Sequence, residues 1–159
     1  MRGAQRGSAS DLEALFDAHW PRAHRAAYLV VHDSALAEDI AQEAFLAAIR
    51  NLDRFDRGRA FGPWLHRIVV NRAIDAARAR SLRREAELTE GAAAEDAREP
   101  ADSTVLAALA GLPPEQRAVV VMRHLLGYTP GEIARALDLP RGTVNSRLRR
   151  GLDAMRSEL

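Results

Sequence analysis

Residues 127–155 read GYTPGEIARALDLPRGTVNSRLRRGLDAM, and the pattern of these residues predicts the fold of the C-terminal part of the chain. Thr129 is suited to cap a helix and Pro130 to occupy its first position, while Glu132 completes a capping box. These signals predict that a short helix begins here. Its inner face would carry the apolar residues Ile133, Ala134 and Leu137.

A second helix is predicted after a break at residues 138–140, where Asp-Leu-Pro interrupts the pattern. It begins near Arg141, and its apolar residues recur every three or four positions. Two short helices joined by so tight a turn form a helix-turn-helix. The apolar positions of the second helix are Val144, Leu148, Leu152 and Met155.

The polar face of this second helix favours contact with DNA. Arginine pairs with phosphate and guanine, asparagine pairs with adenine, and the N-terminal end of such a helix can enter a major groove. The alternative interpretation is an ordinary helical domain whose arginines form a solvated surface. The side chains expected to point away from the core are Arg141, Asn145, Ser146, Arg149 and Arg150.

The composition of the 159-residue chain fits one compact domain or two small ones, because 47% of the residues are hydrophobic. The formal charge is only +1, and all 23 basic residues are arginine. With no cysteine, the chain has no disulfide or thiolate metal site. Neither a signal peptide nor a run of transmembrane length is present. We therefore expect a soluble cytoplasmic protein without membrane insertion.

The N-terminal part predicts a disordered segment over residues 1–10 and then a helix capped by Ser10 and Glu13. Pro21 lies inside this helix, so we expect a kink or two helical pieces. His19 and His24 are five residues apart, on different sides of a helix, and the sequence offers no third metal ligand. We expect no metal site here.

A second N-terminal helix is predicted from Ser34 to about Leu52, after a break at His32-Asp33. Its inward positions are Leu36, Ile40, Ala44, Phe45, Ala48, Ile49 and Leu52. Its outer face places two carboxylates, an amide and a large apolar side chain on one stripe. Such a stripe fits a protein-binding surface and equally fits an ordinary charged surface with one exposed leucine. The stripe consists of Asp39, Gln42, Glu43 and Leu46.

A loop over residues 53–59 precedes a helix predicted from Phe61 to Arg80. One face of this helix carries Arg67 and Asn71, which can hold phosphate and read base edges, close to aromatic residues that can stack on unpaired bases. The alternative is that the aromatic residues belong only to the core and Asn71 is a solvated polar residue.

An acidic segment with few apolar residues spans residues 81–103 and predicts a flexible linker. The sequence therefore predicts an all-α fold of two small helical domains, at residues 11–80 and 104–159, joined by that linker. The helix-turn-helix completes the second domain.

The chain resembles an extracytoplasmic-function (ECF) sigma factor of the sigma-70 family, the short kind that contains only regions 2 and 4. Four stretches carry the resemblance and occur in the family's order. They are AEDIAQEAFLAAI at 37–49, FGPWLHRIVVNRAIDAAR at 61–78, LPPEQRAVVVMRHLLGYTPGEIA at 112–134 and LPRGTVNSRLRRGLDAMR at 139–156.

The resemblance implies partners and residue roles. It implies binding to core RNA polymerase through Asp39, Gln42, Glu43 and Leu46, and capture of the promoter −10 element through Arg57, Arg67 and Asn71. It implies recognition of duplex −35 DNA through Arg141, Thr143, Asn145, Ser146, Arg149 and Arg150. It also implies a cognate anti-sigma factor as a partner. No cofactor or catalytic residue is expected.

Three positions depart from the family pattern. Asp138 stands in a turn where glycine is frequent, and aspartate tolerates that geometry better than most residues. Asn145 replaces a more usual lysine or arginine, which shifts the expected base preference from guanine toward adenine. Gly131 replaces a better helix former, at a cost of about 1 kcal/mol. The main alternative function is a conventional DNA-binding regulator that acts on palindromic sites without polymerase. A helical enzyme is a third possibility, but the sequence shows no convergent nucleophile, base or metal cluster.

Overall fold

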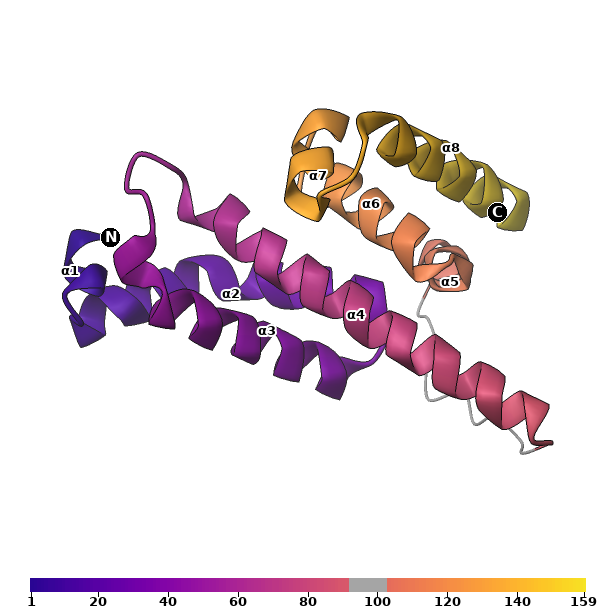
Figure 1. Cartoon of the computed structure of the whole chain (residues 1–159), viewed down its shortest axis with the longest axis horizontal. Helices are drawn as coiled ribbons and strands as arrows, with labels where there is room; N and C mark the ends of the chain where they lie inside the picture. Colours follow the sequence, from indigo (N-terminus) through magenta and orange to yellow (C-terminus); the bar gives the residue numbers. More distant parts are fainter. Residues whose placement is uncertain (92–102) are drawn as a thin grey trace.

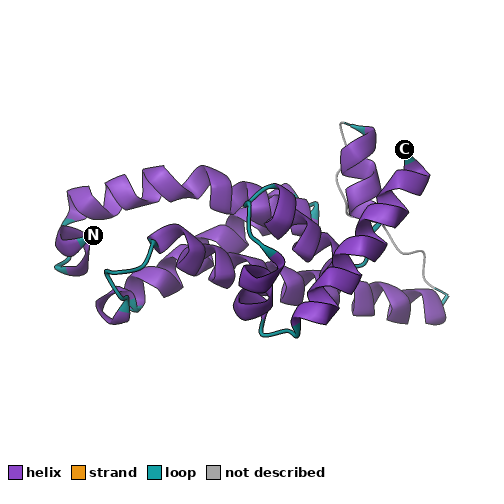
Figure 2. Ribbon diagram, turned by 90° about the horizontal axis from the view of Figure 1, so that it is seen from above, coloured by secondary structure: helices purple, strands orange, loops and turns teal. Residues whose placement is uncertain are grey.

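The computed structural model describes residues 1–91 and 103–159, and every regular element in them is a helix (Figures 1 and 2). The first group of helices comprises α1 (Arg2–Gln5), α2 (Ala9–Val31), α3 (Ser34–Arg50), the 3-10 turn η1 (Leu52–Arg54) and α4 (Phe61–Thr89). The second group comprises α5 (Thr104–Gly111), α6 (Pro114–His124), α7 (Pro130–Leu137) and α8 (Arg141–Glu158). The all-α prediction is confirmed for the described residues.

The core of the first group lies where α2, α3 and α4 pack on one another. Its small side chains, such as Ala23, Ala26 and Ala44, are completely buried and let the helices approach closely. The predicted break between α2 and α3 is confirmed. His32 takes a left-handed conformation (φ 50°) that ends α2, and the Asp33 carboxylate accepts the N–H of Leu36 at 2.9 Å to cap α3.

The first ten residues differ from the sequence prediction. Residues 2–5 form α1 instead of a disordered segment, because Ala4 is only 4% exposed and anchors this turn against the other helices. The predicted cap at Ser10 and Glu13 is also wrong. Ser8 caps α2, and its hydroxyl accepts the N–H of Asp11 at 3.4 Å. The helix therefore begins two residues earlier in the sequence than the Ser10 cap predicts.

Helix α2 continues through Pro21 as a single element, so the alternative of two helical pieces is wrong, and a kink at Pro21 stays a prediction. Proline removes one backbone donor and leaves the carbonyl of Asp17, one turn earlier, without its usual partner. Both residues are exposed, so water can hydrate that carbonyl. The packing of α2 against both α3 and α4 then holds the helix together.

Helix α4 is longer than predicted, because the expected linker does not begin at residue 81. Residues 81–89 continue the helix, and the last turns project beyond α2 and α3 (Figure 1). Arginine, glutamate, alanine and leucine are strong helix formers, and the helix ends just before Gly91, which takes a left-handed conformation (φ 75°). The expectation of a flexible linker for residues 92–102 lies outside the described residues.

The two groups of helices pack against each other, since α2 and α4 contact α5, α6 and α7. Arg117 of α6 lies in this interface and is only 2% exposed. Carbonyl oxygens at helix C-termini carry partial negative charge and can satisfy a buried guanidinium. Arg117 donates to the carbonyls of Leu109 (3.1 Å), Ala110 (2.8 Å) and Leu112 (2.7 Å), and to that of Val30 in α2.

Candidate nucleic-acid and partner interfaces

The predicted cap of α7 is confirmed. The backbone N–H of Thr129 donates to the Glu132 carboxylate at 2.7 Å, and the N–H of Glu132 donates to the Thr129 hydroxyl at 3.3 Å. The hydrogen bonds from Thr129 hold the pKa of Glu132 below its usual range. Asp138 then ends the helix in a left-handed conformation (φ 52°), which an aspartate tolerates better than most residues.

The position of α8 is fixed by its close packing on α6. Val144 and Leu148 are buried in the core, as the apolar spacing predicted. At Gly151 the two helices approach so closely that an added Cβ would lie 3.1 Å from Val120 and 3.4 Å from Leu112. This packing presents the opposite face of α8 to solvent.

The exposed face of α8 carries the residues predicted to read −35 DNA. All six lie within the first ten residues of the helix, next to its partly positive N-terminus. Arg141, Asn145, Arg149 and Arg150 are exposed, while Thr143 and Ser146 are half-buried. Together they form a basic surface with one amide and two hydroxyls, suited to phosphates and base edges.

The three residues predicted to bind the −10 element do not form one cluster. Arg57 lies in the loop before α4, where its Nε donates to the side chain of Gln5. Arg67 and Asn71 lie one turn apart on α4. The Asn71 amide donates to the carbonyl of Arg67 at 2.8 Å and to that of Ala136 in α7 at 3.2 Å. Asn71 is therefore engaged with the helix-turn-helix in this arrangement.

Asn71 belongs to a set of hydrogen bonds that join the two groups of helices, which we call the interdomain hydrogen bonds. The members come from α2 and α4 on one side and from the segment 115–136 on the other. Besides the Asn71 contact, Arg22 donates to the carbonyl of Leu125 at 2.9 Å, and His66 Nδ1 and the Tyr128 hydroxyl lie 2.7 Å apart. Arg78 donates to Glu115 at 2.5 Å, and Arg117 donates to the carbonyl of Val30 as described above.

His66 is the most perturbed titratable group of this contact. Burial lowers its pKa to about 4, and the nearby charges of Arg22 and His19 act in the same direction. Its Nε2 is buried and has no hydrogen-bond partner among the described residues. Burial also raises the pKa of Tyr128 to about 12. Both groups are therefore neutral near pH 7.

The residues predicted to bind core polymerase lie together on the exposed face of α3. Asp39, Gln42 and Glu43 are exposed, and Leu46 is 51% exposed. Ile49 was predicted to face inward but is 37% exposed, because it lies one turn beyond Leu46 at the edge of this face. The face therefore offers two neighbouring apolar side chains beside its carboxylates.

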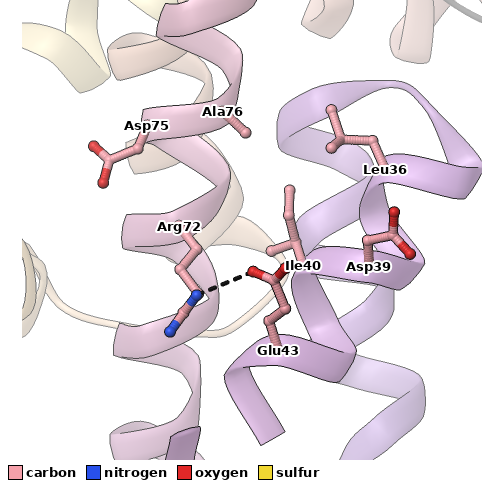
Figure 3. Close-up of a pocket in the computed structure, with 7 residues that line it drawn as sticks. All are labelled: Leu36, Asp39, Ile40, Glu43, Arg72, Asp75 and Ala76. Carbon is pink, nitrogen blue, oxygen red and sulfur yellow. Dashed lines mark hydrogen bonds and ion pairs between the residues drawn. The ribbon is translucent and has the colours of Figure 1, made fainter. Parts of the chain in front are cut away.

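A groove of about 360 Å³ between α3 and α4 adjoins this face. Figure 3 shows Arg72 reaching from α4 to the Glu43 carboxylate of α3, and the two groups are 3.1 Å apart. Arg72 and Asp75 were not predicted to belong to this surface, because only the packing of α4 beside α3 brings them there. The groove is lined by Leu36, Asp39, Ile40, Glu43, Arg72, Asp75 and Ala76.

Residues 1–91 and 103–159 contain no group of three or more histidine, aspartate or glutamate side chains able to hold a metal ion. In the same ranges no helix has the length and apolar character needed to cross a membrane.

Family models match both groups of helices. The model of sigma-70 region 2 matches residues 15–83, and a model of sigma-70 region 4 matches residues 103–155. The first match covers most of α2, with α3 and the greater part of α4, and the second covers the helix-turn-helix.

Curated relatives and solved structures agree with these matches. The ECF sigma factor SigW of Bacillus subtilis is 31% identical over 100% of this chain and 94% of its own length. SigM of Mycobacterium tuberculosis is 40% identical over 87% of this chain and 71% of its own length. The structure of CnrH with the cytosolic domain of CnrY is 27% identical over 98% of this chain and 92% of CnrH, with a TM-score of 0.72. RpoE of Bartonella quintana, solved with the anti-sigma factor NepR, has the same fold with a TM-score of 0.73. It is 22% identical, and the match covers 94% of this chain and 97% of RpoE.

The chain therefore belongs to the ECF RNA polymerase sigma factors of the sigma-70 family. As an alternative sigma factor it directs promoter recognition and transcription initiation. Sigma factors are initiation factors without a catalytic activity of their own. The family and function implied by the sequence resemblance are confirmed.

Proposed function

We propose that the N-terminal half of α8 enters the major groove of the −35 element and reads it through the six residues named above. The observation that carries this proposal is the division of α8 between a buried apolar face and an exposed arginine-rich face. The arginines would contact phosphates or guanine, and Asn145 favours adenine. Compared with the more usual lysine or arginine, Asn145 lacks a positive charge and so contributes less to the general attraction to DNA. Its amide group can instead select a base by hydrogen bonding.

The exposed face of α3 is the proposed docking site for core RNA polymerase. We propose that the chain binds polymerase in the cytoplasm. Carboxylates and an amide surround Leu46, an arrangement that combines a small apolar contact with a polar rim. The Arg72–Glu43 ion pair supports this role, because it holds one of the carboxylates in place from α4. Arg72 and Asp75 extend the same surface.

Capture of the −10 strand is proposed for Arg57, Arg67 and Asn71, and for Asn71 this requires the two groups of helices to separate. Its amide donates to the Ala136 carbonyl, so the side chain must leave α7 before it can pair with a base. The described arrangement is then the form of the free protein, and binding to polymerase opens it.

A protein regulator of the anti-sigma type is a further proposed partner. CnrH, which has the same fold and is 27% identical, has been solved with the cytosolic domain of CnrY. We call the described arrangement, in which Asn71 of α4 donates to Ala136 of α7, the closed arrangement. A regulator that binds the closed arrangement would keep Asn71 away from DNA.

Run-off transcription tests the proposed residue roles. Genomic promoter fragments are transcribed by purified core polymerase with the unchanged chain, with Asn71→Ala, or with Asn51→Ala as a matched control. Asn51 also donates to the carbonyl four residues earlier, at 2.8 Å, but has no assigned DNA contact. We expect Asn71→Ala to reduce open-complex yield with unchanged binding to core polymerase. An unchanged open-complex yield would overturn the role of Asn71. If no transcripts appear and the free chain binds symmetric duplexes tightly, the chain is instead a conventional DNA-binding regulator.

A further inference from the structure

The side chain of Gln5 holds the loop that precedes α4 at three points. Its Nε2 donates to the carbonyl of Leu52 at 2.8 Å and to that of Phe55 at 3.2 Å. Its Oε1 accepts a hydrogen bond from Nε of Arg57. A glutamine amide has two donor hydrogens and one acceptor oxygen, and here both donors and the oxygen are used for a segment about fifty residues away in the sequence.

The position of Gln5 is itself built into the fold. Ala4 is buried beside it, and α1 packs against both α2 and η1. The chain turns from α1 into α2 at Gly7, whose left-handed conformation (φ 80°) is costly for other residues. This turn places α1 alongside η1 and aims the Gln5 amide at the loop.

The loop held by Gln5 is also attached to the start of α4. The Phe55 ring is 7% exposed and lies with its centroid 4.9 Å from that of Trp64 and 5.8 Å from that of Phe61. Arg57 follows two residues later and is exposed. Phe55 is thus fixed by packing, whereas the direction of the Arg57 side chain depends on Gln5.

We propose that Gln5 is a positioning residue for −10 recognition, which it serves by orienting Arg57 toward the DNA strand. This inference rests on the proposed role of Arg57. A free arginine side chain samples many rotamers, and holding it in one direction before binding reduces the entropy lost when it contacts DNA. Loss of Gln5 should therefore weaken binding to the −10 strand roughly threefold to tenfold, which corresponds to the cost of ordering one long side chain on binding.

The test uses the full chain bound to core RNA polymerase and a promoter fork in which the non-template −10 strand is unpaired. The fork sequence is taken from the transcripts mapped by run-off transcription. Apparent dissociation constants are measured for the unchanged chain, Gln5→Ala, Arg57→Ala and the double variant. Arg6→Ala is the matched control, because Arg6 follows Gln5 in the chain and is exposed. Affinity for core polymerase is measured in parallel.

We expect Gln5→Ala to raise the dissociation constant of the fork threefold to tenfold without changing core binding, and Arg6→Ala to leave both unchanged. The effect of Gln5→Ala should disappear in the Arg57→Ala background, since the two residues act as one unit. An unchanged constant, or an equal effect in both backgrounds, would overturn the role of Gln5.

Hydrogen exchange separates this inference from the proposed function. Gln5→Ala should speed exchange of the amides of Arg54 and Phe55, which close the η1 turn. Unchanged exchange would show that Gln5 does not hold the loop. Faster exchange with unchanged fork binding would overturn its role in recognition. If the unchanged chain adds nothing to fork binding by core polymerase, the proposed function fails and this inference fails with it.

Discussion

Acid should destabilise the protein through His66, which lies at the contact between the two groups of helices. Its pKa is about 4 in the folded chain, against an ordinary value of 6.5. The full difference of about 2.5 units corresponds to about 3 kcal/mol of folding free energy. Between pH 7.5 and pH 5.0 the same two pKa values give a loss of about 2 kcal/mol.

The direction of this effect follows from the depressed pKa. Above pH 6.5 the imidazole is neutral in both the folded and the unfolded chain, so its contribution to stability is complete. As the pH falls toward 4, the unfolded chain binds a proton that the folded chain excludes. The folded site excludes it because His66 is buried, its Nε2 has no acceptor among the described residues, and Arg22 repels a second cation.

The assay is urea unfolding of the unchanged chain and of His66→Gln at several pH values from 7.5 to 5.0. Glutamine can still hydrogen-bond the Tyr128 hydroxyl but does not titrate. We expect the unchanged chain to lose about 2 kcal/mol more than the variant over this range. His19 also has a lowered pKa, but it is present in both proteins and cancels. Equal pH dependence in the two proteins would show that His66 does not cause the loss of stability in acid.

Three further changes test the second group of helices. Gly131→Ala should raise the free energy of unfolding by about 0.5–1 kcal/mol in urea titrations, because an added Cβ meets no atom within 4 Å and alanine favours the helix. Gly151→Val should lower the melting temperature and destabilise by about 1–3 kcal/mol, since even a Cβ would crowd Val120 and Leu112. Asn145→Arg should shift the preferred −35 base from adenine toward guanine by about 1–3 kcal/mol, measured as holoenzyme affinity for single-base promoter variants.

The helix-turn-helix was predictable because its signals are local. The cap at Thr129 and Glu132, and the αL residue that ends α7, all lie within ten residues of one another. The same signals failed at the N-terminus, where Ser8 and Ser10 are both able to cap a helix. Burial of Ala4 favours the earlier start, and burial depends on residues far away in the sequence.

The contacts between the two groups of helices were not predictable from sequence patterns. Arg22 and Leu125 are 103 residues apart, and Asn71 and Ala136 are 65 apart. An arginine or asparagine on a helix face looks the same in sequence whether solvent or another helix covers it. For this reason the exposed polar face of α8 could be located from spacing alone, whereas the engagement of Asn71 required the structure.

The closed arrangement adds to the work that promoter opening requires under the proposed mechanism. Melting roughly ten base-pair steps costs on the order of 14 kcal/mol. Two or three captured bases return only ~1–3 kcal/mol each. Breaking the hydrogen bond from Asn71 to the Ala136 carbonyl costs about 0.5–1.5 kcal/mol more. Separating the two groups of helices also breaks the hydrogen bond from Arg117 to the Val30 carbonyl, and water must then hydrogen-bond both groups. The free chain therefore lacks the energy to melt a promoter, and binding to core polymerase must both open the chain and stabilise the bubble.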